Sequence, residues 1–195
     1  ELRRDLENAG VPFHTGTDTE VILHLYERHG ADCVNHLRGM FAFAIWDRRR
    51  RRLFAARDRV GKKPFVYAHA PGGDLAFSSE LASLVESPGS SRDVDETALH
   101  HYLTYQFVPA PRTLWNGAKK LPPAHLLVWE EGRVRTERYW DLHYVPKLRL
   151  GSLAAYRERF LGIFREPVRL RLVSDVPLGA FLSGGVDSSA VVAMM

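Results

Sequence analysis

The chain has 195 residues, 45% of them hydrophobic and 26% charged, which is the composition of an ordinary globular protein. No apolar run approaches the roughly 20 residues that a membrane helix needs, and the single cysteine excludes a disulfide framework, which suits a reducing cytoplasm. The net charge is +4, and its densest run, at residues 48–52, has no interleaved aromatic residues, so we expect a solvated turn there and no nucleic-acid binding.

The first strong local signal is Thr-Asp-Thr-Glu at residues 17–20, a T-x-x-E pattern that is typical of a helix capping box. Apolar residues at helical spacing follow it, and Gly30 stands where helices commonly end. We therefore expect a helix that begins after Thr17 and stops at Gly30, with a short helix to about residue 37 behind it.

Residues 40–46 read Met-Phe-Ala-Phe-Ala-Ile-Trp, so a strand in this segment is apolar on both faces. Such a strand has to be covered on both sides, which favours a layered sandwich with sheets inside and helices outside. Further strands are expected at residues 53–57, 65–70, 75–79, 126–129 and 133–139, the last two forming a hairpin.

Helices are expected at residues 80–85 and from Asp95 to about residue 103, with a surface linker at 87–91 between them. The composition changes near 143–151, where we place a domain boundary. A helical pattern from 152 to about 172 contains Pro167, which should kink or restart the helix, and a short strand near 180–182 comes next.

The residues after that strand, Ser-Gly-Gly-Val-Asp-Ser-Ser at 183–189, lead into an apolar segment that can start a helix. A strand, a glycine loop and a helix in this order place bare backbone N–H groups and the positive end of a helix against an anion. The Walker pattern is absent. The loop resembles the S-G-G-x-D-S pyrophosphate loop of the N-type ATP pyrophosphatases, which predicts nucleotide binding.

Several other motifs narrow the family. Residues 15–23, 37–47, 57–64 and 77–80 resemble the amino-terminal glutaminase domain of glutamine-dependent asparagine synthetase. Residues 105–113 and 120–123 resemble its bacterial B-type members, and 174–179 lead into the glycine loop as they do in that family. The resemblance covers essentially the whole chain, with its motifs in the right order.

The resemblance implies an α+β fold of the N-terminal-nucleophile hydrolase type at residues 1–146, an αββα sandwich without its first part. At 147–195 it implies the start of an α/β adenine-nucleotide α-hydrolase-like ATP pyrophosphatase domain. The implied reaction transfers ammonia from glutamine to a β-aspartyl-AMP made from aspartate and ATP with Mg²⁺, giving asparagine, glutamate, AMP and pyrophosphate. The implied partners are these small molecules, with no nucleic acid and no membrane, and the family allows a homodimer.

The resemblance also implies site residues. Asp18 matches the aspartate that holds the α-ammonium group of glutamine, although an aspartate in a first turn also favours its own helix dipole. Arg57, Asp58 and Gly61 match a structural turn and not catalytic groups. Asp187 is in addition a candidate contact for Mg²⁺ and pyrophosphate. The residues that match the ATP site are Leu182, Ser183, Gly184, Gly185, Val186, Asp187 and Ser188.

The nucleophile of the family is a cysteine at the mature N-terminus, whose own amino group acts as the base. Cys33 lies inside the chain, so we expect a small buried residue there. We therefore interpret the chain as an internal fragment that is inactive alone and has open, aggregation-prone sheet edges. Ala124 stands where the family usually has glycine, which concerns local stability.

Two alternatives stay open. β-Lactam synthetase-like and other amide-forming enzymes resemble asparagine synthetase in this region but act on another carboxylate. The other alternative is a non-catalytic regulatory relative, against which the intact loop at 183–188 argues only for the ATP site.

Overall fold

The protein is described from a computed structural model, which covers residues 1–87 and 91–195. The linker expected at 87–91 therefore lies largely outside the described residues. The chain divides into two compact units, Glu1–Leu142 (unit 1) and His143–Met195 (unit 2), and each unit is described by itself.

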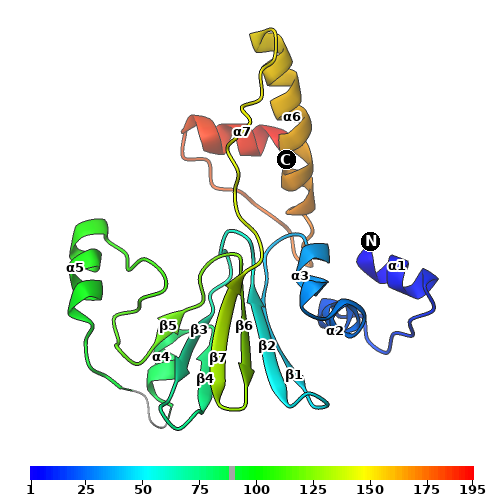
Figure 1. Cartoon of the computed structure of the whole chain (residues 1–195). Helices are drawn as coiled ribbons and strands as arrows, with labels where there is room; N and C mark the ends of the chain where they lie inside the picture. Colours follow the sequence, from blue (N-terminus) through cyan, green and yellow to red (C-terminus); the bar gives the residue numbers. More distant parts are fainter. Residues whose placement is uncertain (88–90) are drawn as a thin grey trace. The chain divides into compact units, whose positions relative to one another are not determined.

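Unit 1 contains two antiparallel sheets, visible side by side in Figure 1. The first sheet has the strand order β1-β2-β6-β7, and the second has the order β4-β3-β5. Every strand expected in this unit forms, and β5, which the sequence did not signal, is added to the second sheet. The strands are β1 (Ala42–Asp47), β2 (Arg52–Arg57), β3 (Val66–His69), β4 (Leu75–Ser78), β5 (Lys119–Lys120), β6 (His125–Glu130) and β7 (Arg133–Arg138).

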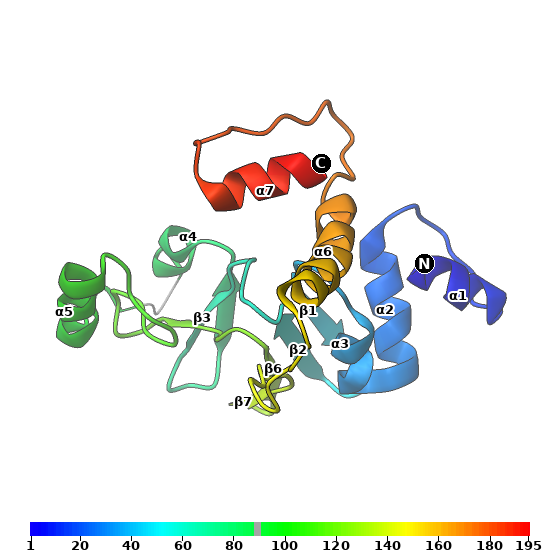
Figure 2. The same cartoon turned by 90° about the horizontal axis from the view of Figure 1, so that it is seen from above.

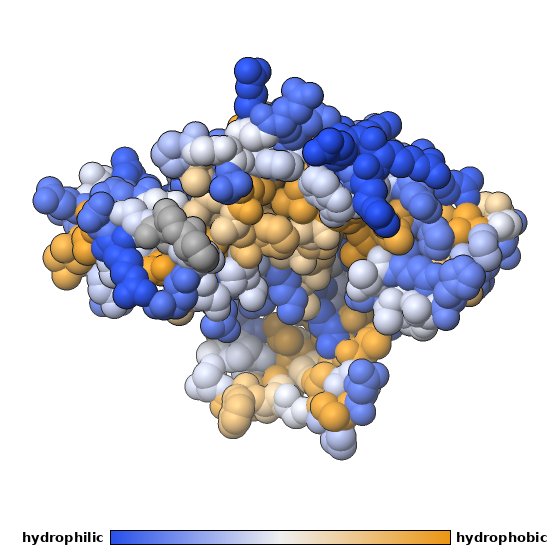
Figure 3. All heavy atoms as spheres, turned by 90° about the horizontal axis from the view of Figure 1, so that it is seen from below, coloured by the Kyte–Doolittle hydropathy of each residue, from blue (hydrophilic) through white to orange (hydrophobic). Residues whose placement is uncertain are grey.

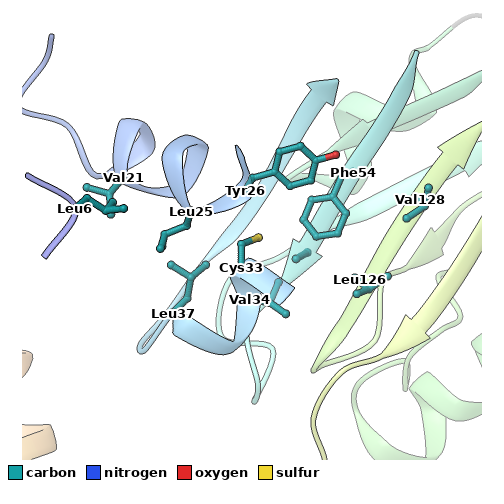
Figure 4. Packing of buried hydrophobic residues seen from close by; sticks show 11 residues of the cluster. Leu6, Val21, Leu25, Tyr26, Cys33, Val34, Leu37, Phe54, Leu126 and Val128 are labelled. Carbon is teal, nitrogen blue, oxygen red and sulfur yellow. The ribbon is translucent and has the colours of Figure 1, made fainter. Parts of the chain in front are cut away.

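Helices cover the outer face of the first sheet (Figures 1 and 2). They are α1 (Leu2–Asn8), α2 (Asp18–His29), the 3₁₀ turn η1 (Gly30–Asp32) and α3 (Cys33–His36). Figure 4 shows how Phe54 of β2 and Leu126 of β6 point toward these helices, where Cys33 is fully buried. Side chains from three helices (α1, α2 and α3) and two strands (β2 and β6) thus form one apolar layer.

The opposite face of the first sheet packs against the second sheet. Ala55 of β2 and Leu127 of β6, each next in sequence to a residue of the helix-side layer, meet Phe65, Tyr67 and Leu121 there. A third layer joins Val66 of β3 to Leu84 of α4 (Leu81–Val85) on the far side of the second sheet. The order helix, sheet, sheet, helix confirms the αββα sandwich.

β1 shows why both of its faces are apolar. Phe43 and Ile45 pack on the helix-side layer, while Ala42 and Ala44 pack between the sheets. The strand lies at the edge of its sheet, and Trp46 at its end is 50% exposed. The arginine-rich segment that follows is the predicted turn into β2, and Asp47 accepts a bond there from the Arg50 N–H (3.0 Å).

α2 begins and ends where the sequence predicts. The predicted capping box, however, does not form its hydrogen bonds. The Thr17 side chain makes no cap hydrogen bond to the helix, since its hydroxyl lies 2.9 Å from the Thr15 hydroxyl. Glu20 turns its carboxylate to the amides of the preceding loop and not to Thr17. Gly30 ends the helix with a positive φ of 58°, as expected.

The helix α5 (Glu96–Tyr105) is capped as predicted by Asp95, whose carboxylate accepts a bond from the Ala98 N–H (3.0 Å). The same carboxylate pairs with Arg112. Gln106 takes the left-handed conformation that closes the helix, with φ 62°.

Unit 2 consists of the helices α6 (Leu153–Leu170) and α7 (Val186–Met194). Pro167 was expected to kink or restart the helix. The helix does not restart there, since α6 continues through Pro167, which lies close to its end, where only the last turn loses a hydrogen bond. The strand expected at 180–182 is also wrong. A strand needs a neighbour for its backbone groups, and unit 2 contains no other strand among its described residues.

Many large hydrophobic side chains remain exposed, including Phe77 and Phe107 in unit 1 and Phe160 in unit 2. In the space-filling view of Figure 3, hydrophobic residues gather in the middle of the face, bordered by hydrophilic ones. Within the two described ranges, every helix is too short or too polar to cross a lipid bilayer.

Candidate functional site

A cavity of about 540 Å³ runs along the open edge strand of the first sheet. Its walls come from the start of α2, from β1 and the residues just before it, and from a loop between β2 and β3. The lining residues are Asp18, Thr19, Ile22, Leu23, residues 40–46, Lys63, Pro64 and Ser79. The cavity is mainly apolar, with one carboxylate and one ammonium group among its lining side chains, which is a composition suited to a small zwitterion.

Asp18 is the first residue of α2 and is exposed to this cavity. An aspartate at this position favours the positive end of its helix. The same carboxylate remains open to the cavity, so the two roles that the sequence left open are compatible in the structure. That Asp18 binds an ammonium group stays a prediction.

The loop before Asp18 is held by two residues that the sequence did not single out for this role. Glu20 accepts bonds from the His14 N–H (2.7 Å), the Thr15 N–H (2.7 Å) and the Thr15 hydroxyl (2.6 Å). Arg3 of α1 donates to the Thr15 carbonyl at 2.6 Å and to the Thr17 carbonyl at 3.2 Å. The Thr15 hydroxyl and these amides lower the pKa of Glu20 to about 2. The carboxylate therefore stays ionised and keeps the loop in place.

The loop on the other side of the cavity is built around Asp58, which is fully buried. Its carboxylate accepts bonds from three backbone N–H groups, those of Val60 (3.2 Å), Lys62 (2.9 Å) and Lys63 (2.9 Å). Three bonds of this kind satisfy a buried charge without a side-chain partner. They also fix the point at which Lys63 meets the cavity wall.

Arg57 supplies the hydrogen-bond donors that hold this loop. Its guanidinium group donates to the carbonyls of Gly61 (2.8 Å), Lys63 (2.7 Å) and Leu121 (2.6 Å). Arg57, Asp58 and Gly61 thus form a structural turn, as the sequence indicates. The signal that could have located the three amide bonds is an Asp followed within three residues by a glycine, a common turn pattern.

The second candidate site lies at the start of α7 in unit 2. Gly184 has a φ of +78°, which favours glycine, and Gly185 is the N-cap residue of the helix. The hydroxyls of Ser183 and Ser188 lie 2.7 Å apart and close the loop, and Ser188 donates to the Gly185 carbonyl (3.1 Å). No side chain of the described residues caps the first amides of this helix.

The remaining residues of the predicted ATP site share this loop. Val186 and Asp187 are in the first turn of α7, and Leu182 precedes the loop in extended chain and not in a strand. Asp187 and the serine hydroxyls are oxygen donors of the type that Mg²⁺ prefers beside phosphate. No group of three or more His, Cys, Asp or Glu in the described ranges is arranged to hold a metal.

Cys33 is buried between the helices and the first sheet, as expected. Burial raises the pKa of its thiol to about 11, so the thiol stays protonated at neutral pH. A protonated, inaccessible thiol is no nucleophile.

The order helix, sheet, sheet, helix, with a cavity along β1, defines the fold class of unit 1 as an αββα sandwich. The sequence model described as "Glutamine amidotransferase domain" matches residues 1–140, and the chain belongs to this family. The model described as "Asparagine synthase" matches residues 159–195.

Curated relatives match over the whole chain. The chain is 39% identical over 195 residues to "Asparagine synthetase [glutamine-hydrolyzing] 3" of Bacillus subtilis (strain 168), covering 100% of the chain and 31% of that protein. It is 38% identical over 194 residues to "Putative asparagine synthetase [glutamine-hydrolyzing] 2" of Methanocaldococcus jannaschii, covering 97% of the chain and 37% of that protein. The chain thus spans about a third of the length of these relatives.

The fold also resembles a solved structure titled "Structure of the allosteric regulatory enzyme of purine biosynthesis". The TM-score is 0.50 at 21% identity, over 72% of this chain and 26% of the other. At this identity the likeness concerns the fold alone.

Proposed function

We propose that the chain is part of a glutamine-hydrolysing asparagine synthetase, an ATP-dependent ligase that uses glutamine as its nitrogen donor. One observation carries the proposal. A glutamine amidotransferase match at 1–140 and an asparagine synthase match at 159–195 follow each other in one chain, in the order of the resemblance. The two compact units, which meet at residues 142 and 143, support a glutaminase domain at about 1–146 and a synthetase domain from about 147.

In this proposal Asp18 binds the α-ammonium group of glutamine. Its support is its place on the cavity wall and the loop behind it, which Glu20 and Arg3 fix with five hydrogen bonds to backbone and side-chain groups. A charge-assisted bond to a positioned carboxylate selects an amino acid over a simple amide.

The loop at 183–188 binds the phosphate tail of ATP, with Mg²⁺ contacted by Asp187. Uncapped helix amides, the left-handed Gly184 and two hydroxyls support an anion at this position. Bound ATP supplies the adenylyl group that activates a carboxylate, and the chain's own loop holds and orients the phosphates.

The test is a product assay of the full-length protein with glutamine, aspartate and ATP. We expect asparagine, glutamate, AMP and pyrophosphate. AMP without asparagine would point to a different acceptor, as in the β-lactam synthetase-like alternative, and the absence of AMP would contradict the proposal.

Asp18→Asn tests the glutamine site within the same assay. We expect the KM for glutamine to rise at least about 10-fold, because a charge-assisted bond is lost, while synthesis from added ammonia is unchanged. Asp5→Asn, an exposed aspartate on α1, is the matched control. An unchanged KM in Asp18→Asn would show that Asp18 serves only its helix.

A further inference from the structure

A second cavity, of about 440 Å³, lies in unit 1 where β5 of the second sheet faces β7 of the first sheet. It shares no lining residue with the cavity along β1. The lining residues are Tyr67, His69, Asn116, Gly117, Lys119, Val134 and Thr136.

Strand geometry brings these side chains to one place. Tyr67 and His69 are two residues apart on β3 and therefore share a face. Lys119 is the cross-strand partner of Tyr67, so their side chains are direct neighbours on that face. Val134 and Thr136 share a face of β7 in the same way and form the opposite wall.

Tyr67 places a hydroxyl group in this cavity. The residue is only 7% exposed, and its ring packs in the layer between the sheets. Its hydroxyl makes no hydrogen bond to any described residue, yet it is not sealed off from solvent-sized space, since Tyr67 lines the cavity. Burial raises the pKa of Tyr67, so at neutral pH the hydroxyl is a donor.

The lining of the cavity contains a positively charged side chain and no negatively charged one. Lys119 is exposed to it and forms no ion pair within the described ranges, and none of the lining residues is acidic. The His69 ring nitrogen Nε2 donates to the Gly132 carbonyl (2.9 Å), and the Asn116 amide donates to the Val94 carbonyl (3.2 Å), which fixes both side chains at the wall. The cavity thus offers an ammonium group and hydroxyl donors without a carboxylate to balance them.

We propose that this cavity binds a small oxyanion, the phosphate or carboxylate group of a small metabolite, between the Lys119 ammonium group and the Tyr67 hydroxyl. The Thr136 hydroxyl lies across from them on β7. The volume is in the range of small-molecule sites. Ligand binding here joins the two sheets at a point where no strand-to-strand hydrogen bond does so.

The proposal is tested by isothermal titration calorimetry of the full-length protein with sodium phosphate and, separately, sodium acetate at constant ionic strength. We expect saturable binding of at least one of them. Tyr67→Phe, which keeps the ring and its packing, and Lys119→Gln should each weaken that binding at least about 10-fold, since each removes one charge-assisted bond. Lys62→Gln, an exposed lysine outside the cavity, is the matched control and should leave the affinity unchanged.

The two arms also identify the ligand. Binding of phosphate alone assigns the site to phosphorylated metabolites, and binding of acetate alone assigns it to carboxylates. The proposal is overturned if neither anion gives a saturable signal. It is also overturned if Tyr67→Phe and Lys119→Gln both bind the anion as tightly as the original protein does. That result would be expected for phosphate held by the glycine loop of unit 2. Thermal unfolding of each variant confirms that the fold is kept.

Discussion

Gly61 lies in a place where a side chain has no room. A Cβ added there would meet the Pro123 ring at 2.8 Å and the Arg57 guanidinium carbon at 3.1 Å, and the residue has a φ of +66°. We expect Gly61→Ala to lower the free energy of unfolding by about 2–4 kcal/mol, the sum of left-handed strain and overpacking. Urea unfolding measures this change.

Gly10 is the matched control for that substitution. It also has a positive φ, +80°, but nothing lies within 4 Å of an added Cβ. Gly10→Ala should therefore cost only the conformational part, about 1–2 kcal/mol. Equal effects of the two substitutions would show that the contacts around Gly61 relax freely.

At the scale of single residues, the sequence indicated which positions have a structural role more often than it indicated the contacts that give them this role. Ala124 stands where the family usually has glycine. The structure shows why glycine suits this position, since the φ of Ala124 is +58°. Cys33 is buried as predicted. The place of the Tyr67 hydroxyl in a cavity depends on β5 and β7, which come from elsewhere in the sequence, so no local pattern could have revealed it.

Among the elements, the start of α2 depends on the ionised form of Glu20. The pKa of this carboxyl is lowered from an ordinary value of 4.5 to about 2, chiefly by the Thr15 hydroxyl. The stabilisation is therefore complete above pH 4.5 and is lost as the pH falls toward 2. We expect Glu20→Gln to remove this part of the acid sensitivity of unfolding.

The measurement is urea unfolding of the original chain and of Glu20→Gln between pH 2 and pH 6. The difference in unfolding free energy should be largest near pH 6 and shrink toward pH 2. Glu96→Gln, at an exposed glutamate in the first turn of α5, is the control. A difference that does not depend on pH would contradict the role of the Glu20 charge.

Whole elements were predictable where a regular pattern of apolar residues was combined with a turn or stop signal. The two-faced segment at 40–46 indicated a covered strand, and Thr17 and Gly30 bounded α2 correctly. The strand near 180–182 failed because its three residues need a partner strand, which unit 2 lacks among its described residues. β5 was missed because two lysines carry no strand pattern.

For the whole molecule, the two units differ sharply in how many hydrophobic side chains they bury. Unit 1 holds all three apolar layers, whereas Val168 is the one hydrophobic residue that is buried among the described residues of unit 2. We expect the amides of α6 and α7 in the 195-residue chain to exchange hydrogen at least about 100-fold faster than those of β2 and β6. Hydrogen exchange followed by mass spectrometry measures this, and equal protection in α6 and β6 would contradict it.

The order of layers was thus predictable from the two-sided strands, but the cavities were not. Each cavity is formed by segments far apart in the sequence, such as β3, β5 and β7 around Tyr67. Sequence patterns report which face of one strand is buried, and they do not report which strands meet at an edge.

β2 and β6 carry buried apolar side chains on both faces, with Phe54 and Ala55 pointing opposite ways as one example. If either strand shifted by one residue, one apolar set would simply replace another, so burial gives little preference for the correct alignment. Within the hairpins β1–β2 and β6–β7, the alignment is instead set at the tips, where Arg51 (φ 51°) and the pair Glu131 and Gly132 (φ 50° and 74°) take the left-handed conformation of tight turns. Two short turns at the rim therefore fix the register of each hairpin before the central β2–β6 pair joins them.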